Sequence, residues 1–251
     1  MTVKHKRKLP INALVFSLSA IAFVGVIFAI IWFWSGKQLW SGKQTELNAN
    51  SALESVIPPY SGQPYAVVNN GIPFFTKEDL TTDSFENYSE LDSLGRCRVA
   101  FANISRELMP TDSRGEIGDI KPTGWKQAKY EGIVDSDPPY LYNRCHLIAY
   151  CLAAEDANER NLITGTRYMN TVGMLPFEEA VVHYLDEYDH HILYRVTPVF
   201  DGNNLVANGV LMEAYSVEDK GAGICFCAFV YNVQPGIEID YRTGESKKDH
   251  G

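Results

Sequence analysis

The chain has few cysteines for its length, and none are paired at CxxC spacing. Five occur among its 251 residues: Cys97, Cys145, Cys151, Cys225 and Cys227. This disfavours a disulfide-stapled scaffold, which is dense in cysteine, and a structural zinc site, which needs closely paired thiols. The odd count leaves at least one free thiol in a monomer. The last two cysteines alternate along an apolar run and are typical of buried strand thiols on one face.

The chain also lacks a basic excess. Residues 45–251 contain 16 Lys and Arg against 31 Asp and Glu, a net charge of −15. A module that holds nucleic acid through a broadly positive surface is therefore disfavoured. The acidity is uneven, because residues 96–170 contain 10 basic and 10 acidic side chains.

No charged residue occurs from Leu9 to Gly36, and the apolar core of this run extends from Ile11 to Trp34. As a helix its 24 residues would reach roughly 36 Å, enough to cross a bilayer. Basic residues precede the run, which predicts a cytoplasmic N-terminus and an exported remainder. The alternative is a cleaved secretory signal, but such a signal has a shorter apolar region followed by small residues. Here Trp32–Trp34 closes the run, as in an interfacial aromatic belt.

These features predict a single-pass protein of a bacterial cell membrane, with its folded domain outside. We expect a cytoplasmic tail at 1–10, a transmembrane anchor at 11–34 and a polar stalk at 35–56. One domain would follow at 57–244, and a short tail at 245–251.

Within that domain, Tyr65–Val68 and Ile72–Phe75 flank Asn69–Gly71 and predict a β-hairpin. Strands are expected at 98–104 and 140–146. A helix with one apolar face follows, because apolar residues recur at helical spacing in Phe177, Val181, Tyr184, Leu185 and Tyr188.

The last third changes to β-rich runs at 192–200, 205–215, 224–233 and 237–241, separated by turn residues. Strands that are neighbours in sequence and joined by short turns favour antiparallel pairing. We therefore expect an α+β fold with a mainly antiparallel central sheet, flanking helices and a site on a strand-loop-helix element.

The segment Tyr142–His146 carries side chains that are suited to catalysis. His146 offers a neutral nitrogen base near pH 7, and Arg144 a fixed positive charge on the same face of a strand. A Cys–His nucleophilic pair is another interpretation of Cys145 and His146, but side chains of neighbouring strand residues diverge.

This segment resembles the Asp-Arg-Gly-His signature of the DNA/RNA non-specific endonucleases, whose site is a ββα-metal, or His-Me, finger. Asn161, Asn170 and Glu178 follow at the family's separations of nine and eight residues. The similarity extends over about 60–244, and the anchored topology is similar to that of membrane-attached bacterial nucleases. Asn143 stands where Asp is commoner in the signature, and Cys145 where Gly is.

The resemblance implies a role for each matching residue. His146 would be the general base, and Asn170 would hold Mg²⁺, with Mn²⁺ as a substitute, in a largely hydrated shell. Glu178 would lie near the water shell of the metal, although an acid in the first helical turn can also be simply solvated. Asn161 would orient the site or contact substrate, or else bond its own backbone.

The resemblance also implies arginines that bind phosphate. Arg144 would lie beside the base as a bidentate donor. Arg114 and Arg96 are further candidates, ranked below Arg144.

The function expected is metal-dependent, sequence-nonspecific cleavage of DNA, with RNA left open as a second substrate. The alternatives are a catalytically inactive nucleic-acid-binding protein and a structural envelope protein. The net charge of −15 argues against the binding protein, and a structural protein has no need for a His, two Asn and a Glu in register.

Overall fold

The computed structural model describes residues 56–250. The expected tail at 1–10, the anchor at 11–34 and the stalk at 35–56, apart from its last residue, lie outside the described residues. Among residues 56–250, no helix is both long and apolar enough to cross a bilayer.

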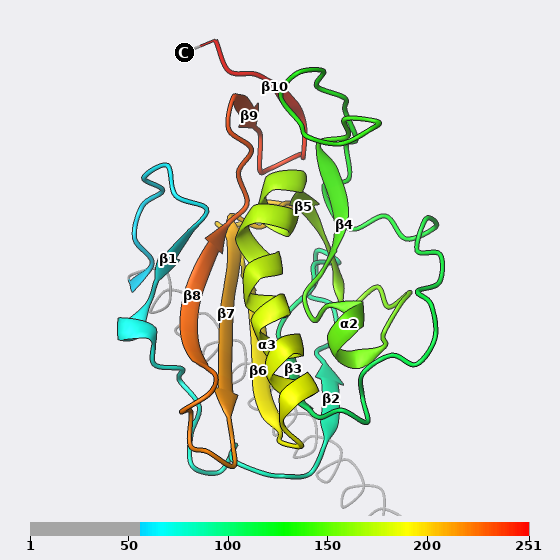
Figure 1. Cartoon of the computed structure of the whole chain (residues 1–251). Helices are drawn as coiled ribbons and strands as arrows, with labels where there is room; N and C mark the ends of the chain where they lie inside the picture. Colours follow the sequence, from blue (N-terminus) through cyan, green and yellow to red (C-terminus); the bar gives the residue numbers. More distant parts are fainter. Residues whose placement is uncertain (1–55, 251) are drawn as a thin grey trace, which may run out of the picture. The chain divides into compact units, whose positions relative to one another are not determined.

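A six-stranded antiparallel sheet in the order β1-β8-β7-β6-β3-β2 organises the fold (Figure 1). Its strands are β1 (Tyr65–Val67), β2 (Phe85–Tyr88), β3 (Ala100–Ile104), β6 (Ile192–Val199), β7 (Gly209–Ser216) and β8 (Cys225–Tyr231). The expected α+β class and antiparallel central sheet are confirmed. Strands β6, β7 and β8 are neighbours in both sequence and sheet because short connections join them.

A second, two-stranded sheet pairs β4 (Tyr142–His146) with β5 (Leu162–Thr166). Between these strands lies the short helix α2 (Tyr150–Ala153), and after them come a π-helical turn, η2 (Met169–Met174), and helix α3 (Leu175–Glu187). This ββα unit lies on one face of the large sheet, with α3 running along β6 to β8 (Figure 1). The expected helix is therefore present, and Pro176 lies in its first turn, where no backbone N–H is needed.

The main core lies between the large sheet and the ββα unit. Val181 and Leu185 of α3 are fully buried against Tyr194, Val196 and other inward-facing residues of the sheet. At about 1.5–3 kcal/mol for each large apolar side chain removed from water, this packing fixes the ββα unit on the sheet.

The predicted hairpin around Asn69–Gly71 is wrong. The turn exists as a 3-10 turn, η1 (Asn69–Gly71), and all three residues have positive φ. However, β1 pairs with β8, and Ile72–Phe75 forms no strand. Instead, the Phe74 N–H donates to the Glu213 carboxylate at 2.7 Å, so this segment lies against a residue of β7.

Near the C-terminus, β9 (Ile237–Ile239) pairs with β10 (Ser246–Lys248). The last strand falls within the segment expected to be a tail. Residues 246–248 are therefore ordered by backbone pairing with β9.

Candidate functional site

His146 is the last residue of β4, and only 6% of it is exposed. Immediately after it, the chain turns away from the strand, and Asn161 holds this corner. The Asn161 side chain accepts from Ile148 N–H and donates to Ile148 C=O, both at 2.9 Å. Its own C=O accepts from Leu147 N–H at 2.8 Å. Because Asn161 is fully buried, its carboxamide orients the backbone beside His146 and does not reach the surface.

The imidazole of His146 has a defined environment on each nitrogen. Nε2 lies 2.9 Å from the backbone C=O of Asp156, and a carbonyl oxygen can only accept, so Nε2 carries the proton. In the neutral ring the lone pair is then on Nδ1, which lies 3.4 Å from an Arg114 Nη. Burial lowers the pKa of His146, and the Arg114 charge lowers it further, although the Asp156 carbonyl opposes both. The ring is therefore neutral at pH 7, with a basic nitrogen on Nδ1.

Arg114 reaches His146 from the loop that precedes β4, and Asp156 anchors this loop. The carboxylate of Asp156 accepts from Gly115 N–H at 2.9 Å, while its second oxygen lies 4.0 Å from Arg114 Nε. The Arg114 side chain stays 45% exposed and keeps donors free for an anion. Sequence reasoning missed Asp156, and since its contact to His146 uses the main chain, no side-chain pattern signals it.

Arg144, which was predicted to be a bidentate phosphate donor beside the base, has two of its five N–H donors engaged by backbone carbonyls. Its Nε donates to Ile120 C=O and one Nη donates to Gly118 C=O. The guanidinium also stacks on Trp125, 4.5 Å from the ring centroid. Alternation does place Arg144 on the same strand face as His146, but the loop 118–125 accepts two of its N–H donors and holds the guanidinium against Trp125. Arg144 therefore holds the loop 118–125 against strand β4.

The expected role of Arg96 in phosphate binding does not fit its contacts either. Its Nε pairs with Asp92 at 2.7 Å, and one Nη donates to the carbonyls of Gly202 and Asn204, both at 2.9 Å. The guanidinium lies 4.5 Å from the ring centroid of Phe200. Arg96 connects two turns at the edge of the domain.

Asn170 lies in the π-helical turn η2 and reaches β4. Its Oδ1 lies 3.0 Å from the thiol of Cys145, the residue directly before His146. The ββα unit thus brings Asn170 to the end of the strand that carries His146. An amide oxygen has two lone pairs, so one stays available for a hard cation.

Glu178 is buried in the first turn of α3, with 8% of the residue exposed. The interpretation of a solvated helix acid is therefore wrong for Glu178 and fits its exposed neighbour Glu179. Burial, with a smaller contribution from the Glu179 charge, raises the pKa of Glu178 to about 8. A nearby divalent cation would favour its ionised form instead.

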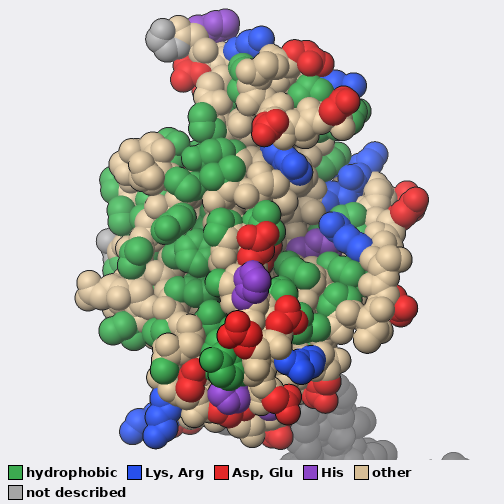
Figure 2. Space-filling view, in the orientation of Figure 1, with side chains coloured by type: hydrophobic (Ala, Val, Ile, Leu, Met, Phe, Trp, Pro, Cys, Tyr) green, Lys and Arg blue, Asp and Glu red, His purple; other side chains and the backbone are tan. Residues whose placement is uncertain are grey.

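Lys and Arg side chains gather beside the loops around β4, and Asp and Glu side chains gather along and below α3 (Figure 2). A histidine is visible in a recess beside the basic group. The acidity of the domain is thus spread unevenly over this face.

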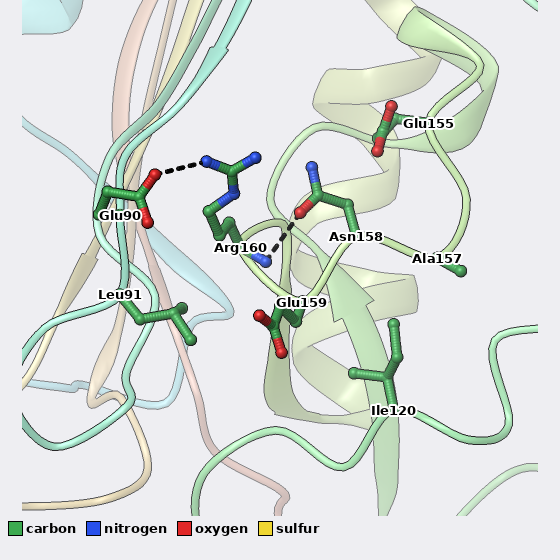
Figure 3. Close-up of a pocket in the computed structure, with 8 residues that line it drawn as sticks. All are labelled: Glu90, Leu91, Ile120, Glu155, Ala157, Asn158, Glu159 and Arg160. Atoms are coloured by element: carbon green, nitrogen blue, oxygen red, sulfur yellow. Dashed lines mark hydrogen bonds and ion pairs between the residues drawn. The ribbon is translucent and has the colours of Figure 1, made fainter.

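A polar pocket of about 670 Å³ borders the site but is not part of it (Figure 3). Three carboxylates contribute to its lining: Glu90, Glu155 and Glu159. The only basic residue that lines it, Arg160, pairs with Glu90 at 2.8 Å. This charge is unsuited to phosphate, so the pocket marks an edge that a polyanion would avoid.

A sequence model of the DNA/RNA non-specific endonuclease family matches residues 76–218, which include the whole ββα unit from β4 to α3 and every candidate residue. Among solved structures, NucA from Streptococcus agalactiae with magnesium bound has 23% identity and a TM-score of 0.66, over 82% of this chain and 96% of that one. The metal-free form of NucA has 24% identity and a TM-score of 0.65, over 81% and 96%. Sda1 nuclease with bound zinc has 23% identity and a TM-score of 0.61, over 74% and 97%. At these identities the structural likeness shows a shared fold.

Proposed function

The chain belongs to the DNA/RNA non-specific endonuclease family, and on that premise we propose that it cleaves DNA, with His146 as general base and Asn170 holding a divalent cation. Its nuclease activity follows from the family. The residue roles, the identity of the metal and the preferred nucleic acid are the parts proposed here.

The observation that carries the proposal is the anchoring of His146. Its Nε2–H is committed to the Asp156 carbonyl, so Nδ1 is the basic nitrogen and its direction is fixed. Because burial lowers the pKa of His146, the neutral form predominates at pH 7. Nδ1 can then accept a proton from the water that attacks phosphorus.

The residues present fit a divalent cation of the magnesium type. Asn170 supplies one amide oxygen, and Glu178 supplies a buried carboxyl from the next helix. Within residues 56–250 no cluster of three or more His, Cys, Asp or Glu side chains forms a metal cage, so most ligands would be water and phosphate. The magnesium in NucA and the zinc in Sda1 support a divalent ion. When bound, the ion would stabilise charge that develops on the phosphate. We assign Mg²⁺, with Mn²⁺ as a substitute.

Arg114 is the arginine best placed to bind the phosphate. It contacts the His146 ring, is half-exposed and has only a long 4.0 Å approach to Asp156. A guanidinium bound to phosphate carries no information about the base, so weak sequence selectivity follows. The contact of Arg114 also holds positive charge beside His146, which disfavours the imidazolium before substrate binds.

We place the enzyme at the outer face of a bacterial membrane, because of the apolar run at 11–34 and the basic residues before it. Protease added to intact cells should then degrade the nuclease domain. Protection until the cells are lysed would contradict this location.

The function is tested by incubating the purified full chain, in detergent, with plasmid DNA and Mg²⁺, and then with chelator. We expect nicking and linearisation that chelator stops, and loss of cleavage by about 10²–10⁴-fold in H146A. H183A is the matched control because His183 is exposed on α3. DNA retention without cleavage by the wild-type chain would favour an inactive binding protein, and equal cleavage by H146A would remove His146 from the mechanism.

A further inference from the structure

Cys145 occupies the strand position directly before the base, where the family signature carries glycine. It is fully buried, and its Sγ lies 3.0 Å from Oδ1 of Asn170. The same sulfur lies 3.4 Å from the thioether of Met174. The backbone C=O of His146 is a more distant acceptor at 3.9 Å, so the nearest oxygen to the thiol belongs to the carboxamide of the residue assigned to the metal.

The Cys145 side chain fits in the core because the residue beside it on the neighbouring strand is a glycine. Gly165 of the neighbouring strand faces Cys145, and a Cβ there would lie 2.7 Å from the Cys145 Cβ and 3.2 Å from its Sγ. A Cβ at this position would also lie 2.9 Å from Met169 Cε. Packing on these sides restricts the thiol, so its direction toward Asn170 is held by the close-packed core.

The chemistry of the contact distinguishes the two ends of the carboxamide. A thiol donates through S–H, while its sulfur is a weak acceptor. A cysteine side chain is ordinarily a thiol at pH 7, so its S–H can donate to the Asn170 oxygen 3.0 Å away. The oxygen of Asn170 is then favoured over its NH₂ group on the side facing Cys145.

We propose that Cys145 is a positioning residue: its thiol orients the Asn170 carboxamide so that oxygen, not nitrogen, is presented to the divalent cation. This inference rests on the proposed function, because it needs Asn170 as the metal ligand. A flipped amide would present N–H donors to a cation and could not bind it.

The direct test measures metal binding in the full chain, without nucleic acid, from the electron paramagnetic resonance signal of free Mn²⁺. We expect C145A to weaken Mn²⁺ binding by about 10-fold, as loss of a group that orients a metal ligand commonly does. C145S keeps a donor and should stay within about 3-fold of wild type. C151A is the matched control, because Cys151 is a partly buried free thiol that lies in α2, outside strand β4. C145G also removes the donor and should repeat the C145A result if C145A does not fold.

A second substitution separates orientation from packing. In N170D the two carboxylate oxygens are equivalent, so no donor is needed to choose between them. C145A should then change Mn²⁺ affinity by less than about 2-fold in the N170D background. A loss of the same size in both backgrounds, or no loss from C145A and C145G in the native background, would overturn the inference.

The proposed function fails in a different way. If N170A binds Mn²⁺ as tightly as wild type, Asn170 is not the ligand, and both proposals fall. If N170A loses binding while C145A does not, the inference about Cys145 alone is refuted.

Discussion

Replacing Glu178 by glutamine should change how the stability of the domain depends on pH. Only 8% of Glu178 is exposed, and burial raises its pKa to about 8 from 4.5. The folded state therefore keeps a proton on Glu178 between pH 4.5 and 8, whereas the unfolded state releases it. Stability is lost as pH rises through this window, because the unfolded state binds fewer protons.

The size of the effect follows from the two pKa values. At about 1.36 kcal/mol for each tenfold change in the protonation equilibrium, the cost above pH 8 reaches about 5 kcal/mol. Glutamine has nearly the same shape and does not ionise, so E178Q escapes this cost. Water entry and local relaxation would reduce the measured value, so 5 kcal/mol is an upper figure.

Urea unfolding at pH 5, 7 and 9 measures this difference directly, with chelator present so that no cation compensates the carboxylate. E178Q and wild type should unfold at similar urea concentrations at pH 5, and E178Q should be more stable by several kcal/mol at pH 9. E179Q is the matched control, since Glu179 is exposed, and it should follow wild type at every pH. Parallel curves for E178Q and wild type would refute the buried, protonated Glu178.

Three further predictions concern the residues around His146. In the pH profile of kcat/KM, the midpoint of the acidic limb should lie below pH 6.5, because burial lowers the pKa of His146. R114A should move this midpoint upward, because it removes a positive charge. A midpoint above pH 6.5 in wild type would contradict this. R114A should lower kcat/KM by about 100-fold with little change in stability. R144A should instead lower the unfolding free energy by about 2–3 kcal/mol and retain more activity per folded molecule. The reverse pattern would favour Arg144 as the phosphate ligand. N161A should lower unfolding free energy by about 2–3 kcal/mol, because the backbone of Ile148 loses both partners, and a stability equal to wild type would exclude Asn161 as the clamp of this corner.

The sheet and its main helix could be predicted because their signals are local. The helical period of α3 and the β-rich runs of β6 to β8, separated by turn residues, are visible within single segments of the chain. The prediction of a strand at Ile72–Phe75 was wrong for a non-local reason, because β1 pairs with β8, which lies far along the sequence.

In the site, too, local patterns were predictable and contacts between distant segments were not. Alternation correctly put Arg144 and His146 on one strand face, but it could not show that the loop 118–125 binds the Arg144 guanidinium through two carbonyls. The role of Asp156 was hidden because its carbonyl holds His146, and every residue has a carbonyl. The space for Cys145 depends on Gly165, on a different strand. Spacing therefore selected the candidate side chains, and tertiary contacts decided how they are held.

The most direct test of the account is chemical rescue of H146A by added imidazole, measured as the rate of plasmid cleavage at saturating Mg²⁺. Loss of the buried ring leaves a space beside Arg114 in which a free imidazole can act as the base. The account predicts that imidazole raises the rate of H146A in proportion to its neutral form and leaves N170A inactive. Cleavage by H146A at the wild-type rate without imidazole, or equal rescue of N170A, would contradict it.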